Sequence, residues 1–253
     1  MRSHELGNTA LYPGAVGVMG HEGRIVATEA SGFARLYADA YTLLPPLERI
    51  AMRSNTIFDM ASVSKLFTSI VVVQLIEQGQ VELEAPVARY LPEFGVQGKQ
   101  DITVRQLLTH TSGLPAWLPL WSAHPDRASR IQAVMDAKPT DPPAAIYRYS
   151  DLNLITLGVM AERLIGKPLD ALVASRITRP LGMRDTGYNP TNRRRTAATE
   201  FQASPARGMV WGEVHDENAW SLGGVAGHAG VFSTAGDMAI LCQTLLNGGT
   251  YKH

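Results

Sequence analysis

The chain reads Phe58-Asp59-Met60-Ala61-Ser62-Val63-Ser64-Lys65-Leu66-Phe67-Thr68 at the point where an apolar segment with helical periodicity begins. Apolar residues then recur every three to five positions, which predicts a helix that ends near Gly79. Ser62 and Lys65 are three residues apart, so on a helix they lie on one face, about one turn from each other.

This spacing is typical of an activated serine nucleophile. A serine hydroxyl reacts poorly until a neighbouring base takes its proton, and a lysine in a buried site can help. Free backbone N–H groups at the start of a helix also favour negative charge that develops near Ser62. A plainer alternative stays open: such a four-residue match occurs by chance in many helices, and Asp59, Ser62 or Ser64 could serve only as a cap.

Composition points to an ordinary globular protein. The 253 residues are 45% hydrophobic and 18% charged, and the chain is long enough for two subdomains. Lys plus Arg and Asp plus Glu are both 23, so the formal net charge is zero, which argues against a nucleic-acid or anionic-membrane partner. The one dense basic run is Arg193-Arg194-Arg195, for which a solvated loop is expected.

The sequence predicts neither a metal site nor a cofactor. Its one cysteine, Cys242, rules out an internal disulfide and a cysteine-based zinc site, and its apolar helical surroundings place it in the expected core. Seven dispersed histidines, His215 among them, show no zinc-ligand spacing. A glycine-rich phosphate loop and a G-x-S-x-G elbow are also absent from the sequence.

No segment reaches the roughly 18 uninterrupted apolar residues that a membrane helix needs, so no membrane span is predicted. The N-terminus lacks the apolar stretch of a signal peptide. As written, the chain is expected in the cytoplasm; if a leader was removed, it is expected to be periplasmic or secreted.

The order of elements predicts an α+β protein. Two strands, 13–20 and 24–32, form an expected hairpin, and helices are then expected over 103–110, 151–165 and 168–177. The segment 186–220 is the least regular. This order suggests a helical subdomain inserted into one that contains an antiparallel sheet. The expected parts are 1–58, with the hairpin strands; 59–190, helical; and 191–253, a return to the first part.

A second group of polar residues precedes the helix expected at 151–165. The chain there reads Tyr147-Arg148-Tyr149-Ser150-Asp151-Leu152-Asn153. A tyrosine at such a junction can relay a proton between a serine and a lysine. Taken alone, Tyr149 is better explained as a half-buried packing residue with a solvated hydroxyl, and Asp151 as an N-cap.

Together these motifs resemble the serine β-lactamase and penicillin-binding superfamily, in particular its class C β-lactamase branch, which includes esterases and D-stereospecific peptidases. Ser62-x-x-Lys65 is followed some ninety residues later by Tyr149-Ser150-Asp151. Further stretches that carry the resemblance are Pro13-Gly14-Ala15-Val16, Leu107-Leu108-Thr109-His110-Thr111-Ser112-Gly113-Leu114-Pro115 and Pro180-Leu181-Gly182-Met183-Arg184-Asp185-Thr186. The resemblance covers nearly the whole chain and implies a β-lactamase/transpeptidase-like fold.

The resemblance implies a role for each matched residue. Ser62 matches the acylated nucleophile, Lys65 its activating partner, and Tyr149 the residue that transfers protons in acylation and deacylation. Asp151 stands where many relatives have the asparagine of a Tyr-x-Asn motif. A carboxylate only accepts hydrogen bonds unless it is protonated, so the usual amide contact to substrate is in doubt at Asp151.

Two further residues are substrate-binding candidates. Trp117 follows the Leu114-Pro115 pair where the family's loop borders the cleft, so it is a candidate pocket wall, with core packing as the equal alternative. His228 lies in Gly227-His228-Ala229-Gly230, which fits the family's third motif literally. The sequence around it looks instead like the glycine-rich turn before a helix capped by Ser233 or Thr234, so His228 is expected to line the cleft.

If that alignment holds, the expected triplet strand and closing helix lie beyond His253. We therefore expect a truncated form with an incomplete sheet, whose exposed edge is covered in a homo-oligomer or by strand exchange. The leading hypothesis is a serine hydrolase that forms an acyl-enzyme on Ser62 with a small-molecule acyl substrate: a β-lactam, a small ester or a D-amino-acid peptide. The alternative is a weakly active or inactive homologue that acts through binding or assembly.

Overall fold

The computed structural model describes residues 5–6, 9–10 and 12–251. By its internal contacts the chain forms two compact units. The strand unit contains the described residues up to Met60, then 178–215 and the residues from Val231 on. The helix unit contains 61–177 and 216–230. Helices and antiparallel strands thus occur as predicted for an α+β protein, whereas the three-part division at 58/59 and 190/191 stays a prediction.

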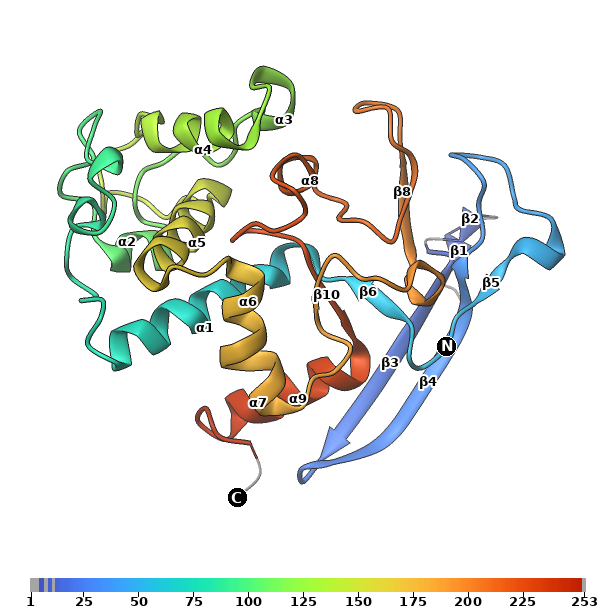
Figure 1. The fold of residues 1–253 in the computed structure, drawn as a ribbon. Helices are drawn as coiled ribbons and strands as arrows, with labels where there is room; N and C mark the ends of the chain where they lie inside the picture. The colour runs from blue at the N-terminus through green and yellow to red at the C-terminus, as the bar shows by residue number, and fades with distance from the viewer. Residues whose placement is uncertain (1–4, 7–8, 11, 252–253) are drawn as a thin grey trace. The chain divides into compact units, whose positions relative to one another are not determined.

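The strand unit is built from small antiparallel sheets. The predicted hairpin is confirmed as β3 (Gly14–His21) and β4 (Arg24–Arg35), drawn in blue in Figure 1. β4 also pairs with β5 (Ile50–Ala51), so β3 lies at the edge of this sheet as far as the described residues show. A second sheet has the order β6–β10–β7, and its strands are β6 (Ile57–Asp59), β10 (Val231–Thr234) and β7 (Gly187–Tyr188). The short strands β1 (Glu5–Leu6) and β2 (Thr9–Ala10) pair with each other.

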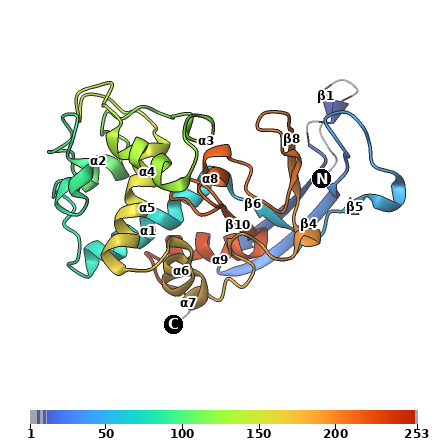
Figure 2. The same ribbon diagram turned by 45° about the horizontal axis from the view of Figure 1, so that its top comes forward.

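The segment 186–220 is more regular than the sequence predicts. It contains the hairpin of β8 (Ala198–Gln202) and β9 (Gly208–Trp211), which is visible in Figure 2 beside the turn at Arg193–Arg195. Most of β8 faces solvent, so it lacks the apolar alternation that would mark it as a strand.

The last helix, α9 (Ala235–Leu246), begins where the sequence predicts, because Thr234 caps it by accepting a hydrogen bond from the Asp237 N–H. α9 packs against β3. Leu241 is buried, but Cys242 is exposed, so the expectation of a core cysteine is wrong. The reason is helical geometry: adjacent residues point about 100° apart, and only one of these two faces the sheet.

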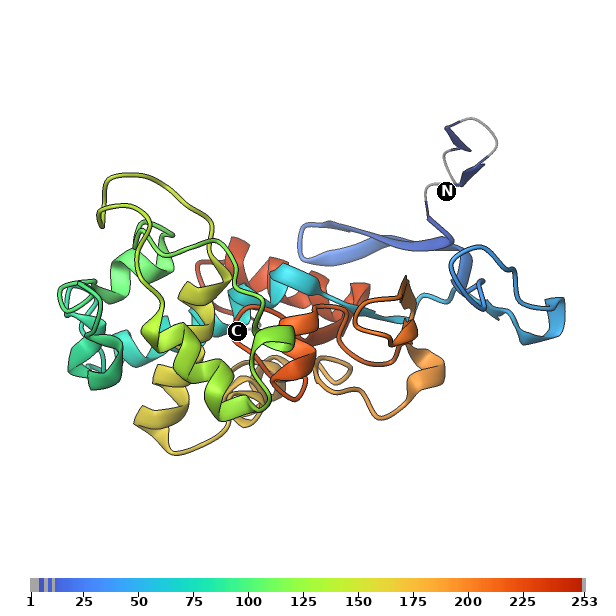
Figure 3. The same cartoon turned by 90° about the horizontal axis from the view of Figure 1, so that it is seen from above.

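The helix unit has α1 (Ser64–Glu77) and α5 (Asp151–Ile165) packed together at its centre, as Figures 1 and 3 show. Both helices carry fully buried side chains, among them Phe67 and Val71 of α1 and Leu157 and Met160 of α5. The other helices are α2 (Val104–Leu108), α3 (Leu120–Ala123), α4 (Arg127–Asp136), α6 (Leu169–Val173) and α8 (Glu217–Ser221). The three-residue helix α7 (Arg179–Leu181) belongs to the strand unit.

No helix among the described residues is long and apolar enough to cross a membrane.

Candidate active site

Ser62 lies in a 3-10 turn, Ala61–Val63, directly before α1. The sequence predicts Ser62 at the N-terminal end of the helix. In the structure the α-helix begins at Ser64, and its N-cap residue, Val63, makes no side-chain capping bond. Ala61 adopts a left-handed backbone with φ of 44°, which is uncommon outside glycine and is typical of backbone held at functional sites. Ser62 is exposed, so its hydroxyl is accessible to a ligand.

Lys65 has an acceptor for each of its three ammonium N–H groups. Its Nζ lies 2.9 Å from Ser62 Oγ, 2.8 Å from Asp151 Oδ1 and 3.2 Å from the His228 backbone oxygen. The side chain is only 8% exposed. A lysine with three such acceptors is a protonated donor, so the Ser62 oxygen accepts a hydrogen bond from a buried positive charge.

Asp151 is the first residue of α5, but its carboxylate does not cap the helix. The N-cap is Ser150, without a side-chain capping bond, while Asp151 forms an ion pair with Lys65. The Asp151 side chain is 17% exposed. Opposite charges at this distance in a partly buried site attract strongly, so Asp151 helps to hold the Lys65 ammonium group in place.

Tyr149 also lies close to the Lys65 ammonium group. The Lys65 Nζ is 4.7 Å from the centre of the Tyr149 ring, a cation–π distance. The same ring stacks on His110, with centroids 4.7 Å apart and an angle of 37° between the planes. The structure therefore brings Ser62, Lys65 and Tyr149 together, as the sequence predicts.

His110 anchors the segment that carries Tyr149. Its Nδ1 accepts a hydrogen bond from the Ser150 N–H at 3.2 Å and lies 3.1 Å from the Asn153 amide nitrogen. An Nδ1 that accepts from a backbone N–H carries no proton, so the ring is neutral. Burial, together with the nearby Lys65 charge, holds the pKa of His110 below its usual value, although Asp151 acts in the opposite direction.

The same loop is tied down at two further points. Ser150 Oγ donates to the Pro115 oxygen at 2.6 Å, and the Asp151 N–H donates to the Ala116 oxygen at 2.9 Å. Sequence reasoning used His110 only as part of a family-like stretch. Its backbone φ of 57° is unusual for a histidine, but no sequence signal shows that.

The Trp117 side chain directly follows this anchored loop and is 46% exposed. Core packing is therefore excluded for Trp117, whereas its contact with a substrate stays a prediction.

His228 is fully buried and points to Asp216. Its Nε2 lies 2.9 Å from Asp216 Oδ1, and the same carboxylate oxygen accepts a hydrogen bond from the Ala219 N–H as the N-cap of α8. Burial alone would raise the pKa of Asp216, but the hydrogen bonds from His228 and Ala219 and the charge of Lys65 lower it to about 2. Asp216 is thus a carboxylate at neutral pH, and His228 donates to it from Nε2. The substrate-binding role of His228 stays a prediction.

The glycine-rich turn binds α1 through its backbone. The Gly227 oxygen accepts from Thr68 Oγ1 at 2.8 Å, one helical turn beyond the bond from Lys65 to the His228 oxygen. A Cβ atom at Gly227 would lie 1.9 Å from the Leu154 oxygen, so only glycine lets the turn approach α5 this closely.

Asp151, Asp216 and His228 offer ligand atoms within 4.8 Å of one another, a spacing that suits a metal ion. Lys65 already provides a positive charge at this place, in direct contact with Asp151. A divalent ion bound to the same carboxylate would be repelled by that ammonium group. We therefore infer that the Lys65 ammonium group, and not a metal ion, compensates the negative charge of Asp151.

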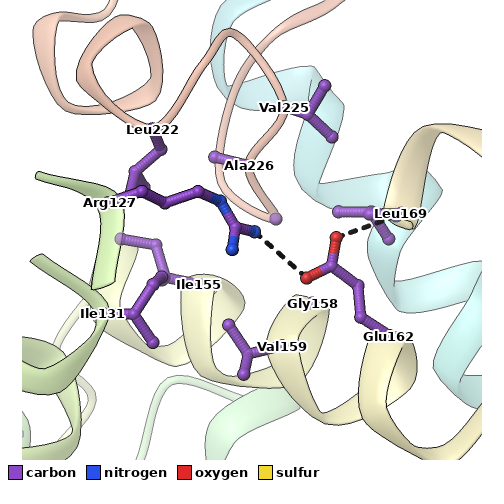
Figure 4. A pocket seen from close by; sticks show the side chains of 11 residues that line it. Arg127, Ile131, Ile155, Gly158, Val159, Glu162, Leu169, Leu222, Val225 and Ala226 are labelled. Carbon is purple, nitrogen blue, oxygen red and sulfur yellow. Dashed lines mark hydrogen bonds and ion pairs between the residues drawn. The ribbon is translucent and has the colours of Figure 1, made fainter. Parts of the chain in front are cut away.

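Figure 4 shows a separate, mainly apolar pocket of the helix unit. It is lined by apolar residues such as Ile131, Ile155 and Val159 and by the ion pair between Arg127 and Glu162. Its free volume is about 10 Å³, roughly what one water molecule requires. None of Ser62, Lys65, Tyr149, Asp151 and His228 lines this pocket, and it is too small for a substrate.

Comparison with known proteins gives a consistent picture. The model of the beta-lactamase family matches residues 6–253. The chain is 34% identical over 273 residues to an N-acetylmuramyl-L-alanine amidase of Bacillus subtilis (strain 168), with 96% of this chain and 61% of that protein covered. It is 32% identical over 271 residues to a putative D-alanyl-D-alanine carboxypeptidase of Escherichia coli (strain K12), with 95% and 61% covered. The chain thus spans about three fifths of the length of these relatives.

Among solved structures, a class C beta lactamase from Rhodobacter sphaeroides superposes with a TM-score of 0.73 at 24% identity, over 95% of this chain and 62% of that one. This similarity confirms the predicted β-lactamase/transpeptidase-like fold.

Proposed function

Because the chain belongs to the beta-lactamase family, we propose that it is a serine hydrolase that forms an acyl-enzyme on Ser62. The observation that carries the proposal is the hydrogen bond of 2.9 Å between the buried Lys65 ammonium and the exposed Ser62 oxygen. An oxygen that accepts from a fixed positive charge is stabilised as the serine loses its proton.

In this proposal Tyr149 carries out the proton transfers, and Lys65 stabilises the charge on the Ser62 oxygen. Lys65 remains the hydrogen-bond donor to the Ser62 oxygen, and Tyr149 relays the proton: its phenolic oxygen accepts the proton from Ser62 as its own O–H proton passes to the leaving group. The Ser62 oxygen attacks the acyl carbon, and the Ser62 N–H stabilises the oxyanion. Water then hydrolyses the acyl ester through the same two residues.

For the acyl donor we propose an amide bond at an alanine residue. The names of the two relatives refer to N-acetylmuramyl-L-alanine and to D-alanyl-D-alanine, which share this chemistry. A β-lactam and a small ester are the other donors predicted from the sequence, and they serve as comparison substrates, because one fold and one catalytic group support several substrates.

The test is covalent labelling followed by turnover. The protein is treated with a fluorophosphonate and with a fluorescent penicillin, and the adduct is located by mass spectrometry. Label is expected on Ser62, none on Ser62→Ala, and full labelling of the control Ser54→Ala, which changes an exposed serine elsewhere. Hydrolysis of N-acetylmuramyl-L-alanine, D-alanyl-D-alanine, nitrocefin and p-nitrophenyl acetate then ranks the substrates. Equal labelling of Ser62→Ala would refute the proposal.

The alternative, an inactive homologue that acts through assembly, is supported by one observation: among the described residues, β3 pairs only with β4 and leaves its other edge open. Light scattering after size-exclusion chromatography separates the two proposals. A stable oligomer without label or turnover supports assembly, and a labelled monomer with Ser62-dependent turnover excludes it.

A further inference from the structure

Four arginines line one pocket in the strand unit. They are Arg49, Arg53, Arg194 and Arg195, and the pocket encloses about 550 Å³. This volume lies within the range of pockets that hold small ligands. None of its lining residues is acidic.

The basic run of the sequence supplies two of these arginines and is not simply a solvated loop. It forms a 3-10 turn in which the side chains separate. Arg193 lies over the Trp211 ring, with its guanidinium carbon 4.5 Å from the ring centre. Arg194 and Arg195 face the pocket. Arg49 and Arg53 come from the residues on either side of β5.

The charge of Arg195 is balanced within the protein. Its two terminal nitrogens bind the two carboxylate oxygens of Asp185 at 2.6 and 2.8 Å, and one of them also donates to the Asn55 oxygen. Its Nε is buried and has no hydrogen-bond partner among the described residues. The bidentate ion pair with Asp185 therefore holds the Arg195 side chain in a fixed position at the edge of the pocket.

The other three arginines, Arg49, Arg53 and Arg194, form no ion pair with a carboxylate among the described residues. Arg49 donates from Nε to the Leu44 oxygen, a neutral acceptor. Three arginine side chains without a carboxylate partner line one pocket, so an anion in that pocket is attracted by their combined positive charge.

We propose that this pocket binds a small phosphate monoester through Arg49, Arg53 and Arg194. A single carboxylate carries one negative charge, which one guanidinium fork satisfies. A phosphate monoester carries close to two charges and three acceptor oxygens at neutral pH, which match several forks at once. The proposal does not depend on Ser62, because no residue of the candidate active site lines this pocket.

Isothermal titration calorimetry of the whole chain, at fixed low ionic strength and pH 7.5, tests the proposal with four probes: inorganic phosphate, phenyl phosphate, dimethyl phosphate and acetate. Saturable binding of phenyl phosphate and inorganic phosphate is expected. Dimethyl phosphate and acetate, which carry one charge each, are expected to bind at least about tenfold more weakly. Equal binding of acetate would overturn the phosphate assignment.

The variant Arg53→Ala/Arg194→Ala removes two exposed side chains and is expected to weaken phenyl phosphate binding by about tenfold or more. The matched control is Arg24→Ala/Arg179→Ala, which removes the same charge from exposed positions outside the pocket and is expected to bind like the unchanged chain. An equal loss in both variants would show non-specific attraction and overturn the proposal, as would the absence of saturable binding. Fluorophosphonate labelling of Ser62 is measured on the same samples, so failure here is separate from failure of the proposed hydrolase.

Discussion

The Lys65 ammonium and the Asp151 carboxylate lie 2.8 Å apart, and both side chains are largely withdrawn from solvent. A buried ion pair of this kind contributes little over an apolar pair, but the loss of one partner is costly, because the other charge is then left without compensation. Asp151 therefore controls the state of the residue that activates Ser62 in the proposed mechanism.

We predict that Asp151→Ala lowers the free energy of unfolding by about 3 kcal/mol, because it leaves the Lys65 charge buried without its counter-charge. Asp151→Asn keeps one acceptor oxygen and is expected to lose about half as much. Urea denaturation followed by circular dichroism measures both. The control is Glu82→Ala, which removes an exposed ion pair with Arg89 and should change stability by less than about 1 kcal/mol. A loss for Asp151→Ala no larger than that of the control would contradict the prediction.

The low pKa of His110 makes the protein less stable in mild acid. The unfolded chain binds a proton on this histidine near pH 6.5, whereas the folded protein binds it only at lower pH. The contribution of neutral His110 to the free energy of unfolding is therefore complete above pH 6.5 and decreases as the pH falls below that value. The melting temperature between pH 7.5 and 5 is the measurement.

The variant His110→Asn should flatten this dependence. Asparagine tolerates the left-handed backbone at this position, and its side-chain oxygen can accept the Ser150 N–H. His21→Asn, at an exposed position, is expected to keep the full dependence. If His110→Asn kept the same slope, another group would be responsible.

Gly227→Ala is expected to disrupt the turn that binds Lys65. The new Cβ would lie 1.9 Å from the Leu154 oxygen, so the backbone must move. We expect a loss of about 2 kcal/mol or more in unfolding free energy, together with slower fluorophosphonate labelling of Ser62. Gly187→Ala is the control, because its Cβ would meet nothing within 4 Å. Two variants of equal stability would show that the close approach is not required.

The exposed thiol of Cys242 should react with 5,5′-dithiobis(2-nitrobenzoic acid) in the native protein. One equivalent is expected to react at a similar rate with and without denaturant. Reaction that appears only after unfolding would restore the core position expected from the sequence.

Local patterns were sufficient for much of the fold. The helix at 151–165 is found with the predicted bounds, since its apolar periodicity is strong and Gly166 ends it in a left-handed conformation. The β8–β9 hairpin escaped prediction because a solvent-exposed strand has no apolar alternation. Cys242 shows a related limit: an apolar neighbourhood in sequence does not say which side of a helix faces the sheet.

In the candidate site, too, local spacing could be predicted from the sequence, whereas contacts between distant segments could not. The spacing of Ser62 and Lys65 places them together without any tertiary information. The pairing of Lys65 with Asp151 joins two helices that are far apart in the sequence, and the pairing of His228 with Asp216 depends on the course of a turn. Residue types alone do not determine such partners.

The acceptors for Lys65 and Thr68 on the glycine-rich turn are main-chain oxygens, of His228 and Gly227. A substitution that changes a side chain cannot delete a carbonyl group. Random mutation at position 228 can therefore alter the buried imidazole while the third acceptor of the ammonium ion survives, provided that the turn keeps its course. Part of the environment of Lys65 thus depends on the position of the backbone and not on side-chain identity. It tolerates many substitutions in the turn and is disrupted mainly by those that displace the backbone.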